Sequence, residues 1–165
     1  MTAISELNKG RNVDVNAIEL LKEDHDRVDK LFQQVKENED GDNRDVFEKI
    51  KAELDVHTHI EETIFYPFLQ ENGDEELKKI VLEGIEEHRQ AKMFLRELES
   101  LVADSEKFAP KLKVLMEDVE HHVQEEEGEM FKMVESQFDK ATLEELGASM
   151  KQEKSKAQRS GTAKA

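Results

Sequence analysis

The sequence predicts an all-α protein, an antiparallel up-down-up-down bundle of four helices, and three observations support this prediction. Only seven glycines and two prolines occur in 165 residues, so few positions interrupt a helix. Apolar residues recur at steps of three and four along four long segments, the spacing that places side chains on one face of a helix. The links between these segments are short, which favours antiparallel neighbours.

The four segments follow one another with recognisable ends. Asn16 is an expected N-cap for the first helix, and the turn sequence NEDGDN at 38–43 separates it from the second. Pro67 and Gly73 bring the second helix to its end, and Pro110 suits the first turn of the fourth. The apolar stripes of the four helices span residues 18–35, 47–68, 77–102 and 112–133.

The length suits a single domain with a sizeable core, and we expect four parts along the chain. Residues 1–15 form a flexible N-terminal segment, and residues 16–137 form the four-helix bundle. Residues 138–150 form a short helix that packs back on the bundle through Leu143 and Leu146. Residues 151–165 carry five basic residues and one acid, which predicts a disordered, solvated tail.

Composition excludes several classes of function. The formal net charge of −16 argues against a nucleic-acid partner, because such binding depends on clustered Lys and Arg. The absence of cysteine excludes disulfides, iron–sulfur clusters and thiolate zinc sites, so nitrogen and oxygen atoms must hold any metal. No signal-peptide core or long uncharged apolar stretch occurs, which predicts a cytoplasmic protein without a membrane partner.

Polar side chains occupy positions that the apolar stripes reserve for the core. His57 has Leu54 at i−3, whereas His59 has Asp55 at i−4, so His57 points inward. The same comparison selects His122 over His121. Carboxylates buried without partners would cost several kcal/mol each, and a metal removes that penalty. The nitrogen and oxygen donors suit iron, manganese or zinc. The predicted metal ligands are His25, His57, Glu61, His88, His122 and Glu126.

The ligand pattern occurs twice. The pairs His57–Glu61 and His122–Glu126 place an imidazole and a carboxylate one helical turn apart. Helices 1 and 3 each add one histidine, preceded by an acid in Asp24-His25 and in Glu87-His88. Each half is therefore a hairpin that carries H…HxxxE, and a pseudo-twofold axis is expected to relate the halves.

These residues resemble the hemerythrin-like, or HHE cation-binding, family, whose pattern is H…HxxxE…H…HxxxE on a four-helix bundle. The flanks LLKEDHDRVDKLF, HTHIEETIFYP and HHVQEEEGEMF are also similar, and the match covers residues 16–137. The resemblance implies a non-haem di-iron centre, two iron ions in the Fe2+ or Fe3+ state with an oxo or hydroxo bridge. It also implies a small ligand such as oxygen, nitric oxide or peroxide. By the resemblance, His25 and His57 hold one iron, His88 and His122 hold the other, and Glu61 and Glu126 bridge them.

The chain departs from the oxygen carriers of the family at one position. These carriers have a further histidine one turn before the ligand on helix 3, and Gly84 stands there in this sequence. This predicts an extra water or an open coordination position, which favours reactivity or sensing over reversible oxygen carriage. Glu126 is preferred to Glu127 as ligand, since five residues put Glu127 about 140° round the helix from His122.

Other polar residues are expected outside the site. Tyr66 lies half a turn off the face of His57 and is predicted to be a packing residue on the bundle surface or between helices, not a ligand. The carboxylates of Glu62, Glu125 and Glu129 are expected on solvated helix faces, where one of them could orient a ligand.

Three functions agree with this pattern. The first is a di-iron protein that binds a small ligand for sensing, detoxification or oxygen and iron handling. The second is a di-iron oxidoreductase with peroxidase-like or catalase-like activity, and the third is a helical bundle that the metal only stabilises. A ferritin-like site is excluded, because no histidine follows a glutamate by three residues. The sequence indicates no protein partner and leaves open whether the protein is an enzyme.

Overall fold

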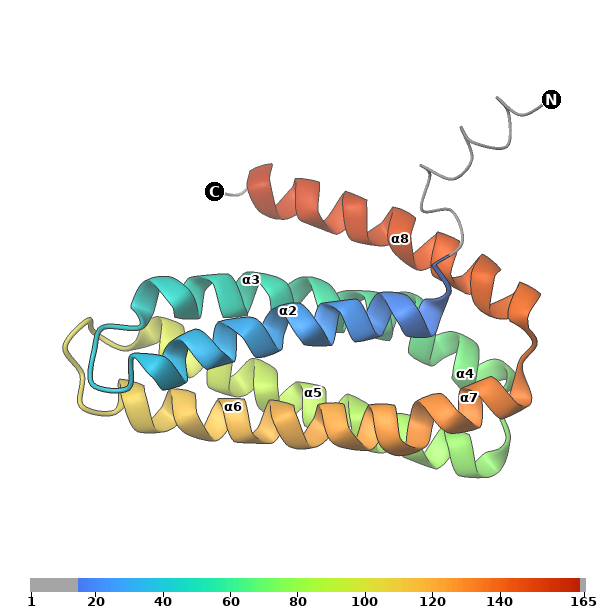
Figure 1. The fold of residues 1–165 in the computed structure, drawn as a ribbon, viewed down its shortest axis with the longest axis horizontal. Coiled ribbons are helices and arrows are strands. Elements are labelled where there is room, and N and C mark those ends of the chain that lie inside the picture. The colour runs from blue at the N-terminus through green and yellow to red at the C-terminus, as the bar shows by residue number, and fades with distance from the viewer. Residues whose placement is uncertain (1–14, 164–165) are drawn as a thin grey trace.

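The structure, a computed structural model, describes residues 15–163, and the predicted flexible segment therefore lies almost wholly outside the described residues. Figure 1 shows the predicted antiparallel four-helix bundle. Its four rods are α2 (Ala17–Glu37), α3 (Arg44–Ile60) continuing into α4 (Tyr66–Asn72), α5 (Glu75–Ser100), and α6 (Phe108–Glu125) continuing into α7 (Phe131–Gln137). A further helix, α8 (Lys140–Ala163), crosses outside α2 and α3.

Helix ends follow the predicted signals. The side chain of Asn16 accepts a hydrogen bond of 2.9 Å from the backbone of Glu19, and Asp74 caps α5 in the same way. These bonds satisfy backbone N–H groups that have no partner inside the helix. The predicted apolar stripe of the third helix extended too far. The helix α5 ends at Ser100, and Val102 lies beyond its end and is exposed to solvent.

Two short π-helical turns interrupt the second and fourth rods at equivalent places. The turn η1 (Glu61–Phe65) joins α3 to α4, and η2 (Glu126–Met130) joins α6 to α7. A π-turn bonds residue i to residue i+5, and here the backbone N–H of Tyr66 bonds to the carbonyl of Glu61. Phe131 bonds to Glu126 likewise. Each π-turn adds one residue to the helical rod. The side chains after the turn therefore point in a different direction from the one that a regular period of 3.6 residues predicts.

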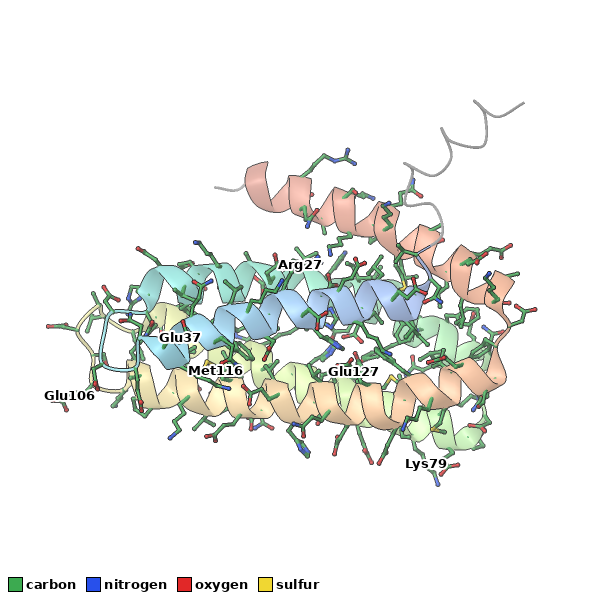
Figure 2. All side chains as sticks on the ribbon, in the orientation of Figure 1. Arg27, Glu37, Lys79, Glu106, Met116 and Glu127 are labelled. Atoms are coloured by element: carbon green, nitrogen blue, oxygen red, sulfur yellow. The ribbon has the colours of Figure 1, made fainter. Side chains whose placement is uncertain are left out.

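The side chains, drawn as sticks in Figure 2, form two apolar clusters inside the bundle, one on each side of the buried polar groups. The first lies at the end formed by α4 and α7 and includes Leu21, Phe65 and Leu77. The second lies toward the opposite end and includes Phe32, Phe47 and Leu98. The six predicted ligands come between these clusters along every rod, so apolar side chains exclude water on both sides of them.

The helix α8 corrects the expectation of a short helix followed by a disordered tail. It runs unbroken to Ala163 rather than ending near residue 150. Leu143, Leu146 and Met150 are buried in the first apolar cluster, which anchors its first half. Glu153 and Lys154 also contact the bundle, through His59 and Asp24, and the exposed residues that continue the helix include good helix formers such as Lys156 and Arg159.

The contact between α8 and the start of α2 leaves no room for a side chain at Gly147. A Cβ atom there would lie 2.6 Å from the carbonyl oxygen of Val15 and 2.8 Å from the nitrogen of Ala17. We expect Gly147→Ala to lower the free energy of unfolding by about 1–3 kcal/mol, because backbone atoms must move apart. Thermal or urea denaturation measures the change.

The matched control is Gly161→Ala in the same helix, where an added Cβ would meet nothing within 4 Å. That variant should be neutral or slightly stabilising, since alanine favours helix over glycine. Equal effects of the two substitutions would contradict the close packing of α8.

Candidate metal centre

The predicted ligands converge at one level of the bundle. His25 comes from α2, His57 from α3, His88 from α5 and His122 from α6, while each π-turn begins with one of the two glutamates. All six side chains are buried, and both carboxylates are almost inaccessible, with Glu61 at 0% and Glu126 at 2% exposure. The register argument that chose His57 over His59 and His122 over His121 therefore agrees with the structure, since His121 and His59 are exposed.

Each buried carboxylate lies between histidines of the two halves. Oε1 of Glu61 is 2.7 Å from Nε2 of His57 and 3.3 Å from Nε2 of His88. The two oxygens of Glu126 lie 3.2 Å from Nε2 of His25 and 3.2 Å from Nε2 of His122. Every ring thus turns its Nε2 atom toward a shared carboxylate.

Most of these buried atoms lie close together without forming hydrogen bonds. Two sets of donors have atoms within 4.8 Å of one another, the first made of Glu61, His88, His122 and Glu126, and the second of His25, His57 and Glu126. Unbonded buried polar groups are costly, and a cation would satisfy all of them at once. The atoms without a hydrogen-bond partner include Nε2 of His25, His57 and His122, both oxygens of Glu61, and Oε1 of Glu126. The donor set therefore fits a metal, with four imidazoles and two carboxylates as borderline ligands.

Outer carboxylates fix the orientation of two rings. Nδ1 of His57 lies 3.0 Å from Oδ2 of Asp24, and Nδ1 of His122 lies 2.8 Å from Oε1 of Glu87. A carboxylate on Nδ1 leaves the lone pair of Nε2 free for a metal and holds the ring in place. In the sequence these carboxylates were visible as the acidic residues that precede His25 and His88. Each of them contacts the histidine of the next helix and not its own neighbour.

The other two rings also have acidic neighbours. Nδ1 of His25 is 3.3 Å from Oε2 of Glu127, and Nδ1 of His88 is 3.7 Å from Oε2 of Glu62. Glu62 is half-buried and also pairs with Lys92, and its position beside His88 agrees with the expectation that one of the outer glutamates could orient a ligand. Because Glu62 and Glu127 each follow an inner glutamate by one residue, they lie at equivalent places in the two halves.

Tyr66 lies between helices, one of the two predicted places, but on the face of the site and not half a turn away from it. It is fully buried, and its hydroxyl donates a hydrogen bond of 2.6 Å to Oε2 of Glu126. The hydroxyl also lies 3.4 Å from Nε2 of His88. The π-turn η1 is the reason, because its wide turn puts Tyr66 directly over Glu61 instead of half a turn away. A usable signal was the aromatic residue five positions after the inner glutamate in both halves, Tyr66 and Phe131.

The same side chain lies against Gly84, and the extra water or open coordination position stays a prediction. A Cβ atom at Gly84 would lie 3.0 Å from the hydroxyl of Tyr66, so the phenol fills the space that the glycine leaves. On the other side of the site, next to His25, Leu21 takes the place of Gly84 and Phe131 takes the place of Tyr66. The two sides of the site therefore match in ligands, and the phenol is one polar group in which they differ.

Comparison with known proteins agrees with this geometry. The family model of the hemerythrin HHE cation-binding domain matches residues 16–134. The chain belongs to this hemerythrin family. A crystal structure of a hemerythrin HHE cation-binding domain-containing protein from Mycobacterium kansasii superposes with a TM-score of 0.77 at 27% identity, covering 91% of both chains.

Two curated relatives match over shorter shares of their own lengths. An uncharacterized hemerythrin-like protein from Schizosaccharomyces pombe is 30% identical over 105 residues, which cover 63% of this chain and 52% of the relative. A DNA nickase from Nostoc sp. is 25% identical over 150 residues, which cover 88% of this chain and 41% of the nickase. This hemerythrin-family chain thus spans about half or less of each curated relative. Among its described helices, none is long and apolar enough to cross a membrane.

The buried carboxylates raise the pKa of two inner histidines. Burial lowers the pKa of His57, but the charge of Glu61 and the hydrogen bond to Asp24 outweigh burial and raise it to about 10. Burial likewise lowers the pKa of His122, yet the charge of Glu126 raises it well above its usual value. The pKa of Tyr66 is raised well above its usual value by burial and by Glu126, so Tyr66 is a neutral donor.

A small apolar cavity adjoins the hemerythrin site. Its volume is about 160 Å³, and the four inner histidines line it together with aliphatic side chains such as Val28, Leu54, Leu95 and Val119. A water molecule takes about 30 Å³ of liquid volume and drug-sized ligands need about 300 Å³ or more, so the cavity suits small molecules and is too small for a drug-sized ligand.

The substitution Tyr66→Phe tests the hydroxyl of Tyr66 with little steric change, since Phe131 already fills the equivalent place. We expect the metal-free protein to lose about 2 kcal/mol of unfolding free energy, because the buried carboxylate of Glu126 loses its hydrogen-bond donor. Urea denaturation measures the loss. Ser100→Ala removes a solvent-exposed hydroxyl as control and should change stability by less than about 0.5 kcal/mol. Equal losses would refute the special role of the buried phenol.

The raised pKa of His57 predicts how the stability of metal-free protein depends on pH. Folding raises this pKa from 6.5 to about 10, so the proton stabilises the folded state fully below pH 6.5. That stability is lost as the pH rises through about 10. The melting temperature of metal-free protein should therefore fall between these pH values, and His57→Gln should flatten the fall. An equally steep profile in the variant would contradict the assignment.

Proposed function

We propose that this protein binds two iron ions with His25, His57, Glu61, His88, His122 and Glu126, and that the site takes up a very small ligand such as oxygen, nitric oxide or peroxide. The observation that carries the proposal is the set of buried, unbonded donor atoms around two shared carboxylates. Family membership supports a bound cation, and the position of each carboxylate between two histidines supports two ions bridged by Glu61 and Glu126.

The choice of iron rests on the donor set and the family. Four imidazoles and two carboxylates provide no thiolate, which removes the sites that favour copper(I) or clusters. Zinc and manganese accept the same donors, so the metal must be identified by reconstitution. When bound, a pair of iron ions would supply Lewis acidity and electron transfer.

The residues around the site would bind and orient the reactants. Asp24 and Glu87 hold the rings of His57 and His122 so that each Nε2 atom faces the shared carboxylates. The two apolar clusters keep bulk water away from both sides of the site. The cavity of about 160 Å³ has room for a molecule the size of oxygen, nitric oxide or peroxide next to the inner histidines.

The pair Gly84 and Tyr66 favours a reactive or sensing role over oxygen carriage. In this chain a phenol, not an imidazole, fills the space one turn before His88. A phenol hydroxyl can donate a proton to a bound small molecule or to Glu126, whereas the oxygen carriers use a histidine at that level as a ligand. We therefore propose detoxification or sensing of oxygen, nitric oxide or peroxide as the role.

Anaerobic reconstitution with Fe(II) tests the proposed function. We expect two iron ions per chain by metal analysis, a higher melting temperature, and visible charge-transfer bands after exposure to oxygen, peroxide or azide. Steady consumption of peroxide would establish the oxidoreductase function instead of a binding role. Metal uptake without any ligand-dependent absorbance would reduce the site to a structural one.

Single variants locate the binding residues in the same assay. His57→Ala and Glu126→Ala should each lose at least one of the two ions, because each removes a donor from the converging set. The matched control is His121→Ala, which removes the exposed histidine next to His122. Equal loss of iron in all three variants would overturn the assignment of the ligands.

A further inference from the structure

One of the four outer carboxylates differs from the others in burial. The side chain of Asp24 is 2% exposed, whereas the side chains of Glu62, Glu87 and Glu127 are between 28% and 36% exposed. Water can solvate the three exposed carboxylates. Asp24 depends on neighbouring protein groups for its compensating charge.

Both oxygens of Asp24 are engaged. Oδ2 lies 3.0 Å from Nδ1 of His57, and Oδ1 is contacted by Arg27 and by Lys154. Lys154 is the more deeply placed of the two cations, with 15% of its side chain exposed against 42% for Arg27. A chain of contacts therefore runs from α8 through a buried carboxylate to an inner histidine.

The position of α8 makes this contact specific. Its last buried apolar residue, Met150, lies one turn before Lys154, and Glu153 pairs with His59 of α3 at 2.9 Å. Figure 1 shows that α8 crosses the bundle over α2 and α3. The equivalent carboxylate of the other half, Glu87, forms its ion pair with His122 and lies on α5, away from this helix.

We propose that Lys154 of α8 is a positioning residue that holds Asp24 and thereby His57, so that the metal position on α2 and α3 retains its ion longer than the position on α5 and α6. The inference rests on the proposed function, since it assumes two bound ions. In this proposal α8, which lies outside the four-helix bundle, makes the metal position on α2 and α3 differ from the similar position on α5 and α6.

The expected size of the effect follows from the place of Lys154 in the chain of contacts. Loss of a group that contacts a metal ligand directly lowers metal affinity by about 10- to 100-fold. Lys154 acts one contact further out, through Asp24, and Arg27 remains to compensate part of the charge. We therefore expect an effect near the lower end, about tenfold.

The experiment measures release of Fe(II) from the loaded, full-length protein to a chromogenic ferrous chelator under anaerobic conditions. Wild type should release its two ions in two phases of equal amplitude. Lys154→Met, which keeps the aliphatic stem, should accelerate the slow phase about tenfold and leave the fast phase unchanged. Lys154→Arg should restore the slow phase.

Two further variants separate positioning from general stability. Lys111→Met removes another cation that pairs between helices, with Glu97 far from the site, and should change neither phase. In the background of Asp24→Asn, which already lacks the charge, Lys154→Met should have no additional effect, since the lysine acts through Asp24. The melting temperatures of the metal-free variants report any loss of folding separately.

The outcomes distinguish the two proposals. A wild-type protein that takes up no iron overturns the proposed function and the inference with it. Two bound ions released in a single phase, or an unchanged slow phase in Lys154→Met, overturn the inference alone. Acceleration of both phases, or an undiminished effect of Lys154→Met in the Asp24→Asn background, assigns Lys154 to general stability and also overturns it.

Discussion

The burial of two carboxylates among four imidazoles is the constraint on which the rest of this structure depends. Glu61 and Glu126 lie in the middle of a helical bundle with almost no access to solvent. Burying a carboxylate without a partner would cost several kcal/mol of stability. The helices around Glu61 and Glu126 therefore have to place positive charge beside them. The histidines face the carboxylates for this reason, and protons or metal ions can supply the charge. The apolar clusters on both sides keep the local dielectric low and make that requirement stricter.

The same constraint explains why each glutamate begins a π-turn. A regular helix brings a residue and its i+4 neighbour to one face, which serves the step from His57 to Glu61. The wide turn then presents a fifth residue to that face, so that the ring of Tyr66 stacks on His88 and the ring of Phe131 stacks on His25. In these turns the regular hydrogen bonds between residues i and i+4 of the helix are replaced by bonds between residues i and i+5. Such π-turns are common at functional sites.

Much of the fold and the inner site could be predicted from the sequence because both follow the 3.6-residue period. Before the π-turns, that period correctly separated His57 from His59 and His122 from His121. After the turns it failed, since an inserted residue leaves no trace in composition, and Tyr66 was therefore placed half a turn away from where it lies. The helix over residues 151–163 was missed for a different reason. Its charge suggested a solvated tail, although many of its residues favour helix. The contact of Lys154 with Asp24 joins residues far apart in the sequence and could not be seen in the local pattern.

The two hairpins repeat their ligands but not their surroundings, and the differences fall on opposite sides of the site. On the side of the site next to His88, the phenol of Tyr66 lies over Gly84, whereas on the side next to His25 the equivalent residues are Phe131 and Leu21. On the side next to His57, the orienting carboxylate of Asp24 is buried beneath α8. A polar group that can donate a proton therefore stands beside His88, while the more enclosed carboxylate stands beside His57. The repeated histidines compensate the charge of the two buried glutamates. The residues that are not repeated, Tyr66 and Asp24, allow the two proposed metal positions to differ in chemistry.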